Sequence, residues 1–358
     1  MEKHPTLEDV ARSAGVSKST VSRVLNDSAR ISEQTRQRVL DAVRTLRYEP
    51  NIIARSLSKN KTNTIGVILE DILNPFYSAV AKGIETALRT SGYSMILTSS
   101  DFDYDSEVRL TRMLVRYKVD GILITPMRHD GESIALLKER SLPFFILNGR
   151  SEDREVSWID SDHFEGALLA ARYLLDLGHR RFMCLRHMAI DGSRLRYEGF
   201  RQAIEEAGLN LSDQIVLGDA RSRLDGYELA GRFIDTHGVR GLPSAVIAVN
   251  DTVAIGVIEA LLEREVRVPE DVSIIGYDDV NIAGLIRVPL TTIHQPNFRM
   301  GEIGASQLID KIERAEMGVS RQFLIQPKLV ERDSCRPWGT PAAEPLHTHG
   351  TKKRTTGY

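Results

Sequence analysis

Two groups of side chains in this sequence have the types and spacing for specific hydrogen bonding, and the first lies near the amino terminus. Ser17, Lys18 and Ser19 open a helical pattern, and Arg23 lies about one turn further along it. An arginine can donate two hydrogen bonds to guanine O6 and N7 in the major groove, a contact worth about 1–3 kcal/mol of discrimination. Short polar side chains at predicted helix ends suit phosphates, and these are Thr6, Ser22, Ser32 and Asn51. The alternative is a small helical bundle with solvated charges.

The second group consists of polar and aromatic side chains near the ends of predicted strands. They are Phe76, Tyr77, Asn148, Asn250 and Asp278, together with Arg196 at the predicted start of a helix. In open α/β sheets, ligands bind beyond the carboxyl ends of the strands. Carboxylate and amide oxygens accept hydrogen bonds from hydroxyl groups, arginine donates to oxygens, and aromatic faces cover C–H groups. The set therefore suits a neutral polyol in a cleft.

Each of these side chains also has a plainer interpretation. Asp278 can cap a turn, Arg196 can form a surface ion pair, and Phe76 can belong to the core. Arg150 and Arg221 are further cations that would suit a phosphorylated or acidic sugar, with solvated arginines as the alternative. The chemical identity of the ligand stays open at this level.

Catalytic and metal-binding patterns give no convincing match. The sequence has no G-x-S-x-G, P-loop or H-E-x-x-H motif. Its two cysteines, Cys184 and Cys335, lie far apart, which excludes a disulfide scaffold and a cysteine-based zinc site. His347 and His349 could hold a metal loosely, but a solvated tail explains them equally. We expect no enzyme activity, no cofactor and no metal.

Composition is that of an ordinary soluble protein of two or three domains. The chain has 358 residues with a net charge of −2. Residues 1–60 hold 11 Lys and Arg against seven Asp and Glu, and the remainder holds 36 against 42. A basic head on an acidic body favours a polyanionic partner for the head. The sequence shows no apolar run of membrane length and no secretory signal, so we expect a cytoplasmic protein and no membrane partner.

Residues 1–50 are predicted to form an all-α, helix-turn-helix head. Apolar residues recur at helical spacing in three short segments. Thr6, Ser17 and Ser32 are the predicted N-caps of the three helices. Gly15 lies between the first two helices, where a tight turn needs a residue that tolerates positive φ. Residues 51–63 form a polar connection.

Apolar runs of strand length alternate with helical segments from residue 64 onward. The predicted strands are 65–69, 93–98, 121–125, 143–147, 181–185, 245–249 and 272–276. Helical segments include 76–89, 107–117, 164–177, 197–207, 253–264 and 300–316. This alternation indicates doubly wound parallel sheets, and its length favours two α/β lobes. Residues 337–358 lack periodicity and are predicted to be a disordered tail.

Residues 6–26, TLEDVARSAGVSKSTVSRVLN, closely resemble the DNA-binding head of the LacI/GalR family of bacterial transcription regulators. Further matching motifs follow in the same order: YEPN at 48–51, ARSL at 54–57, LGHRR at 177–181, GF at 199–200 and GYDD at 276–279. Arg196 stands in the R-x-x-G-F context of family ligand arginines. Many co-linear motifs make the resemblance specific, and it extends to about residue 336.

The resemblance implies DNA contacts throughout the head and the connection. The matching positions are Thr6, Ser17, Lys18, Ser19, Thr20, Ser22, Arg23, Asn26, Ser32, Asn51, Ala54 and Leu57. Lys18 and Ser19 fall where family members differ and choose different operators. In the family, the 51–63 segment becomes a helix only on DNA, and a leucine matching Leu57 wedges the central base step of the minor groove. The alternative is that Leu57 packs on the body.

For the body, the resemblance implies a periplasmic-binding-protein-like core at 64–336. The expected N-lobe spans about 64–161 and 292–322, and the C-lobe about 162–291 and 323–336. The expected protein is a homodimeric repressor of sugar-utilisation genes that reads a pseudo-palindromic operator and answers to a sugar or sugar derivative. The missing leucine heptad in the tail favours a dimer over a tetramer. The alternatives are a sugar-binding protein of a transport system and a sugar-processing enzyme; the sequence predicts neither the effector's identity nor the operator.

Overall fold

The computed structural model describes residues 5–25, 31–48, 61–187, 190–314 and 320–339, and contacts divide the chain into units at 1–63 and 64–358. The head contains α1 (Leu7–Ala14), α2 (Lys18–Leu25) and α3 (Glu33–Leu46). The predicted caps are confirmed: Thr6 forms a capping box with Asp9, the Ser17 hydroxyl accepts from the Thr20 amide at 3.1 Å, and Ser32 caps α3. Gly15 has φ +63°, as the predicted turn requires.

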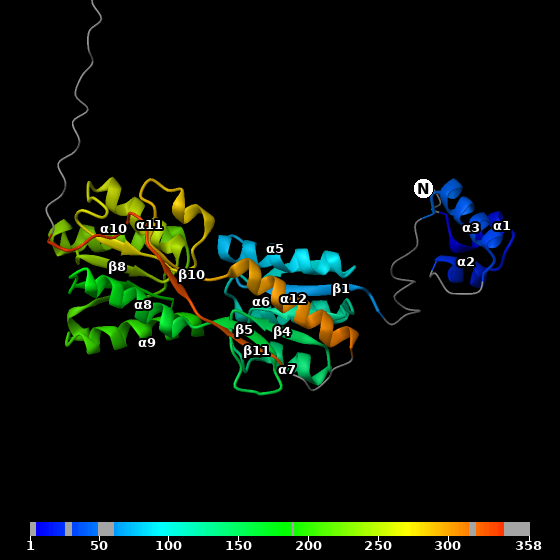
Figure 1. The fold of residues 1–358 in the computed structure, drawn as a ribbon, viewed down its shortest axis with the longest axis horizontal. Coiled ribbons are helices and arrows are strands. Elements are labelled where there is room, and N and C mark those ends of the chain that lie inside the picture. Colours follow the sequence, from blue (N-terminus) through cyan, green and yellow to red (C-terminus); the bar gives the residue numbers. More distant parts are fainter. Residues whose placement is uncertain (1–4, 26–30, 49–60, 188–189, 315–319, 340–358) are drawn as a thin grey trace, which may run out of the picture. The chain divides into compact units, whose positions relative to one another are not determined.

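The N-lobe is built on a parallel sheet, six-stranded within the described residues (Figure 1). In spatial order its strands are β11 (Gln322–Ile325), β5 (Trp158–Ser161), β4 (Phe144–Leu147), β3 (Gly121–Ile124), β1 (Thr64–Leu69) and β2 (Ser94–Ser99). Its helices are α5 (Pro75–Thr90), α6 (Tyr104–Arg116), α7 (Glu132–Glu139) and α12 (Asn297–Glu313). Helix α5 packs against α12, and α6 against α7.

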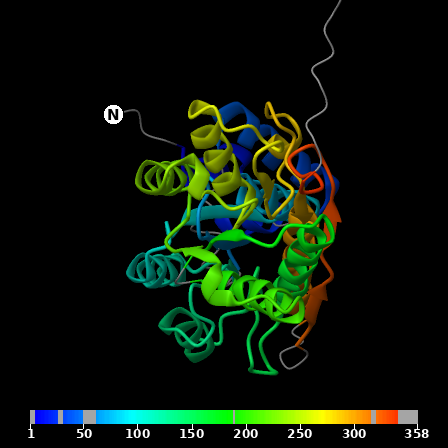
Figure 2. The same cartoon turned by 90° about the vertical axis from the view of Figure 1, so that its left-hand side faces the viewer.

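The C-lobe has a second parallel sheet, four-stranded in the described part of the chain, with helices around its strands (Figure 2). Its order is β7 (Ile215–Leu217), β6 (Phe182–Leu185), β8 (Ala245–Ala248) and β9 (Ser273–Ile275). Helix α8 (His163–Asp176) packs against α9 (Asp191–Glu206), and α10 (Arg223–His237) against α11 (Asp251–Glu263). Short 3-10 helices are η1 (Leu211–Asp213), η2 (Val239–Gly241) and η3 (Asn281–Gly284). Two parallel-sheet lobes confirm the predicted fold class.

The chain passes between the lobes slightly later than expected at two of its crossings. Strand β10 (Thr292–His294) pairs antiparallel with β12 (Lys328–Val330). An isolated β-bridge between Asp278 and His294 connects β10 to the C-lobe. Residues 322–325 form β11 in the N-lobe sheet. The crossings therefore follow residues 294 and 325, instead of preceding 292 and 323. These short strands are defined by distant partners, which local periodicity does not reveal.

Two further expectations need correction. Helix α9 begins at Asp191, six residues before the predicted 197 start. The predicted disordered tail begins too early, because the Trp338 amide donates to the Leu177 carbonyl at 2.8 Å and its ring lies 5.8 Å from that of His179; residues 340–358 lie outside the described residues. Among the described helices, none is long and apolar enough to cross a membrane.

Candidate functional site: an effector cavity and a DNA-reading helix

The start of α2 presents an exposed group of polar side chains. The Ser17 hydroxyl lies 2.7 Å from the Ser19 hydroxyl and 2.8 Å from that of Thr20. The Lys18 ammonium lies 2.8 Å from the Glu8 carboxylate of α1, and this contact lowers the pKa of Glu8. Both side chains are more than half exposed, so the pair adds little to stability. Glu8 thus positions Lys18, and the sequence pattern did not predict this pair.

The other predicted DNA contacts fall into two classes. Arg23 is exposed and Ser22 half-buried on α2, whereas Thr6 and Ser32 already use their hydroxyls as helix caps. A helix cap still leaves the end of its helix open to a phosphate, since unpaired amides point outward there. The remaining predictions, Asn26, Asn51, Ala54 and Leu57, lie outside the described residues.

A cavity of about 50 Å³ lies between the two lobes of the core. All six predicted effector-binding residues line it: Phe76, Tyr77, Asn148, Arg196, Asn250 and Asp278. It adjoins a groove of about 780 Å³, and Glu70, Asn148 and His163 line both. Residues that follow strands of both sheets line the cavity, and for this reason side chains more than 200 positions apart in sequence meet here.

The C-lobe wall of the cavity is organised around Arg196. The guanidinium donates to the Val249 carbonyl, lies 3.7 Å over the Tyr277 ring and 3.7 Å from the Asp278 carboxylate. Arg196 lies in the second turn of α9, and not at a helix start, and its side chain is only 15% exposed. It therefore forms an ion pair, as the plainer interpretation has it, but a buried one that faces the cavity.

The acids and amides of the same wall are held in specific roles. Burial raises the pKa of Asp278 to about 6, against the opposing effect of Arg196, and Gln295 donates to its Oδ1 at 2.6 Å. The Asn250 Oδ1 atom caps α11 by accepting from the Val253 amide at 2.8 Å. Asn250 can therefore offer a ligand chiefly its NH₂ group. The next residue, Asp251, is fully buried and anchors the 278–280 turn through the Val280 amide at 2.8 Å.

The N-lobe wall is both core and cavity lining. Phe76 and Tyr77 are 2% and 5% exposed, and their rings meet edge to face at 5.0 Å. The Tyr77 hydroxyl donates to Glu70 and lies 3.5 Å from the Asn148 side-chain nitrogen. The plainer interpretation of Phe76 as core is correct, yet its place in the lining also allows it to cover the apolar side of a ligand.

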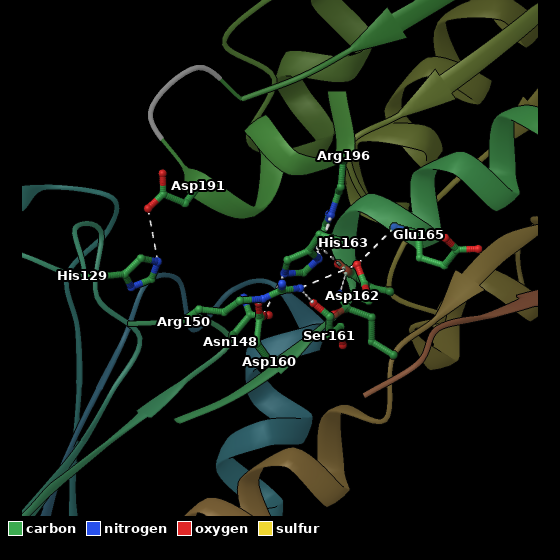
Figure 3. Close-up of polar contacts among 12 residues, drawn as sticks. His129, Asn148, Arg150, Asp160, Ser161, Asp162, His163, Glu165, Asp191 and Arg196 are labelled. Atoms are coloured by element: carbon green, nitrogen blue, oxygen red, sulfur yellow. Dashed lines mark hydrogen bonds and ion pairs between the residues drawn. The ribbon is translucent and has the colours of Figure 1, made fainter. Parts of the chain in front are cut away.

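A chain of polar contacts connects the lobes beside the cavity (Figure 3). Arg150 donates from Nε to Asp160 at 2.8 Å and from Nη2 to the Ser161 carbonyl at 3.0 Å. Asp160 lies 3.1 Å from His163 Nε2, and Arg196 donates to His163 Nδ1 at 3.4 Å. His163 is buried, which lowers its pKa, so the neutral ring can donate from Nε2 and accept at Nδ1. Arg150 is thus held by Asp160, while its side chain stays 33% exposed to the groove.

Comparisons with known proteins agree over both parts of the chain. The description "Bacterial regulatory proteins, lacI family" matches residues 6–51, and "Periplasmic binding protein-like domain" matches residues 171–335. The ribose operon repressor of Escherichia coli (strain K12) is 37% identical over 332 residues, covering 92% of this chain and 99% of the repressor. The chain belongs to the lacI family of bacterial regulatory proteins. It is a transcriptional regulator with a helix-turn-helix head, and its relatives are named as regulators and not as enzymes.

Solved structures show the same likeness. A LacI family regulator from Enterococcus faecium with bound ribose is 31% identical, with a TM-score of 0.68, over 76% of this chain and 99% of the other. The lac repressor dimer bound to operator and the anti-inducer ONPF is 26% identical, with a TM-score of 0.82, over 93% of this chain and all of the other.

The cavity of this lacI-family regulator has lining residues beyond the six predicted ligand side chains. Glu70, His163 and Gln295 line the cavity but were not predicted. Glu70 directly follows the first predicted strand, so the strand-end criterion that found Asn148 could have found it. His163 and Gln295 lie beside lobe crossings, which local periodicity does not reveal.

A contact between His129 and Asp191 spans the groove between the lobes of this lacI-family core (Figure 3). His129 Nε2, in the loop after β3, lies 3.2 Å from the carboxylate of Asp191, the first residue of α9. Gly149 leaves space for the imidazole, because a Cβ there would lie 2.5 Å from His129 Cε1. Burial lowers the pKa of His129, while Asp191 opposes the shift.

Proposed function

We propose that this regulator binds a pseudo-palindromic operator as a homodimer and that a small sugar-like effector in the interlobe cavity releases it. The observation that carries the proposal is the meeting of six predicted ligand side chains around one cavity lined by both lobes. A ligand that contacts both walls changes the relative stability of lobe arrangements, because it binds one arrangement better than another. The ribose named for two relatives supports a sugar as the ligand class.

We assign operator reading to the exposed start of α2. Ser17, Lys18 and Ser19 stand where the second helix of this motif enters the major groove, and Arg23 follows along it. A coupling of about 1–3 kcal/mol between the cavity and the head would give about 5- to 150-fold control of operator affinity. The cavity, in this proposal, binds its effector without converting it.

Fluorescence anisotropy on a duplex from upstream of the protein's own gene tests the proposal. We expect tight binding compared with a scrambled duplex, and weakening by one member of a panel of sugars. Equal, weak binding to both duplexes with a steep salt dependence would indicate phosphate contacts alone and contradict operator recognition. Recovery of the active sugar unchanged checks that it is not a substrate.

Arg196→Lys tests the effector site independently of the DNA-reading head. Lysine carries one compact ammonium and cannot contact Val249, His163 and Asp278 together, so we expect effector response to fall at least about tenfold. Operator affinity without effector should stay unchanged. Arg201→Lys is the matched control, since Arg201 on the same helix pairs with Glu198 and Glu205 at the surface. An unchanged response in Arg196→Lys would contradict the assignment of the cavity.

A further inference from the structure

Two buried acceptor atoms of the cavity lining have no hydrogen-bond partner among the described residues. They are the Asn148 Oδ1 and Gln295 Oε1 atoms. Gln295 is fully buried and spends its amide nitrogen on Asp278, so its oxygen is what it can offer a ligand. Buried polar atoms in native proteins nearly always have partners. These two acceptors therefore indicate a ligand that donates hydrogen bonds.

Glu70 adds a buried carboxyl group to this acceptor set. Its side chain lines both the inner cavity and the groove, it is 3% exposed, and the Tyr77 hydroxyl donates to its Oε2. The charged and titratable groups that act on it come from four segments: Tyr77 on α5, Glu107 on α6, Arg196 on α9 and Asp71 in its own loop. Burial dominates over all of them and raises the pKa of Glu70 to about 8.

No cation of the described residues forms an ion pair with Glu70. Arg196, the nearby cation that acts on it, is occupied by the Val249 carbonyl, the Tyr277 ring and Asp278. Arg150 is held by Asp160. Isolated buried carboxylates are costly, and such a group either stays protonated or receives a cation. A bound ligand that carries a cation would supply such a partner to Glu70.

We propose that Glu70 makes the cavity selective for a cationic, donor-rich ligand, namely an amino sugar. The inference rests on the proposed effector function and narrows its ligand class. An ammonium group offers three donors and no acceptor, and its hydrogen bond to a carboxylate is charge-assisted. Sugar hydroxyls donate to Asn148 and Gln295. When the ammonium binds, Glu70 releases its proton to solvent, and the carboxylate and ammonium form the ion pair.

Calorimetry on the full-length protein tests this with matched sugar pairs. We would titrate glucosamine against glucose, galactosamine against galactose and mannosamine against mannose, at about pH 6.5, where Glu70 is protonated in the free protein. Two buffers of different ionisation enthalpy report the protons released. We expect one amino sugar to bind at least about tenfold more tightly than its neutral partner and to release close to one proton.

Two variants assign the selectivity to Glu70. In Glu70→Gln, which keeps an acceptor for Tyr77, the amino sugar should lose its roughly tenfold advantage and its proton release. Glu139→Gln is the control, because Glu139 is an exposed acid at the end of α7 that lines neither the cavity nor the groove. It should keep both properties.

Three results would overturn the inference: no binding of any amino sugar at millimolar concentration, binding without proton release, or selectivity that survives in Glu70→Gln. Tight operator binding that a neutral sugar weakens would refute the amino-sugar assignment and leave the proposed function standing. Loss of operator binding itself would refute the proposed function.

Discussion

Burial controls the protonation of the acids around the cavity. Glu70 and Asp278 have pKa values raised to about 8 and about 6, and the pKa of Asp251 is raised well above its ordinary value. In each case desolvation is the largest cause, and hydrogen bonds from neighbours oppose it only in part. These acids therefore reduce the stability of the free core as the pH rises, which is a cost that a ligand cation could offset.

Glu70→Gln should flatten the dependence of stability on pH. Between about pH 4.5 and 8 the folded protein keeps a proton on Glu70 that the unfolded chain has released, so the free energy of unfolding falls as the pH rises through this window. Glutamine does not titrate, so the variant does not show this loss of stability. Each unit by which the pKa of Glu70 is raised corresponds to at most about 1.4 kcal/mol of the loss. We compare the free energy of unfolding of the variant with that of the wild type at each pH. We expect this difference to shift in favour of the variant by about 1–4 kcal/mol between pH 5 and pH 8.

Urea unfolding followed by tryptophan fluorescence at the two pH values measures this difference, since both tryptophans, Trp158 and Trp338, lie in the core unit. Glu139→Gln, at an exposed position on α7, serves as the control and should leave the pH dependence unchanged. A constant difference between wild type and Glu70→Gln at both pH values would show that Glu70 titrates normally.

At the level of elements, the helix pairs of the core cross at glycines. A Cβ on Gly83 of α5 would lie 1.9 Å from the Phe298 carbonyl oxygen of α12, and one on Gly301 would lie 2.0 Å from the Val80 oxygen of α5. Gly226 of α10 and Gly256 of α11 meet the facing backbone in the same way. These glycines therefore allow the backbones of the paired helices to approach each other closely.

Gly301→Ala should destabilise the core strongly. The added methyl group meets a backbone oxygen that cannot move without shifting a helix, so we expect a loss of about 1–3 kcal/mol or more. Gly284→Ala is the control, because its nearest neighbour is the Arg332 side chain at 3.5 Å, an ordinary contact. Thermal unfolding of both variants distinguishes them, and equal melting temperatures would contradict the close crossing.

At the scale of the whole core, His129 and Asp191 connect the lobes across the groove. Polar contacts of this partly exposed kind contribute at most about 1 kcal/mol. We expect His129→Ala to speed dissociation of the active sugar by up to about fivefold, as measured by stopped-flow fluorescence. Arg128→Ala is the control, since Arg128 pairs with Asp130 inside the same loop. Identical dissociation rates for wild type and His129→Ala would show that the pair does not restrain the ligand.

Effector and operator should also weaken each other by the same factor. Thermodynamic linkage requires that, if the active sugar lowers operator affinity tenfold, operator DNA lowers sugar affinity tenfold. Calorimetric titration of the sugar into free protein and into protein saturated with operator duplex checks this. Unequal factors would mean that the two titrations involve different assemblies, and an oligomer measurement by sedimentation on both samples would then locate the difference.

The sequence by itself determined the features that depend on neighbouring residues. Thr6, Ser32 and Gly15 carry local capping and turn chemistry, and alternating strands and helices place Phe76, Asn148 and Asp278 near the carboxyl ends of strands, where open α/β sheets bind ligands. Only the tertiary structure decided which of these groups are charged, free or occupied. Arg150 is held by Asp160, Arg196 donates to the Val249 carbonyl, and Glu70 is buried without a cation among the described residues. The reason is physical: hydrogen-bond partners and desolvation come from segments far apart in the chain, and local patterns carry no record of them.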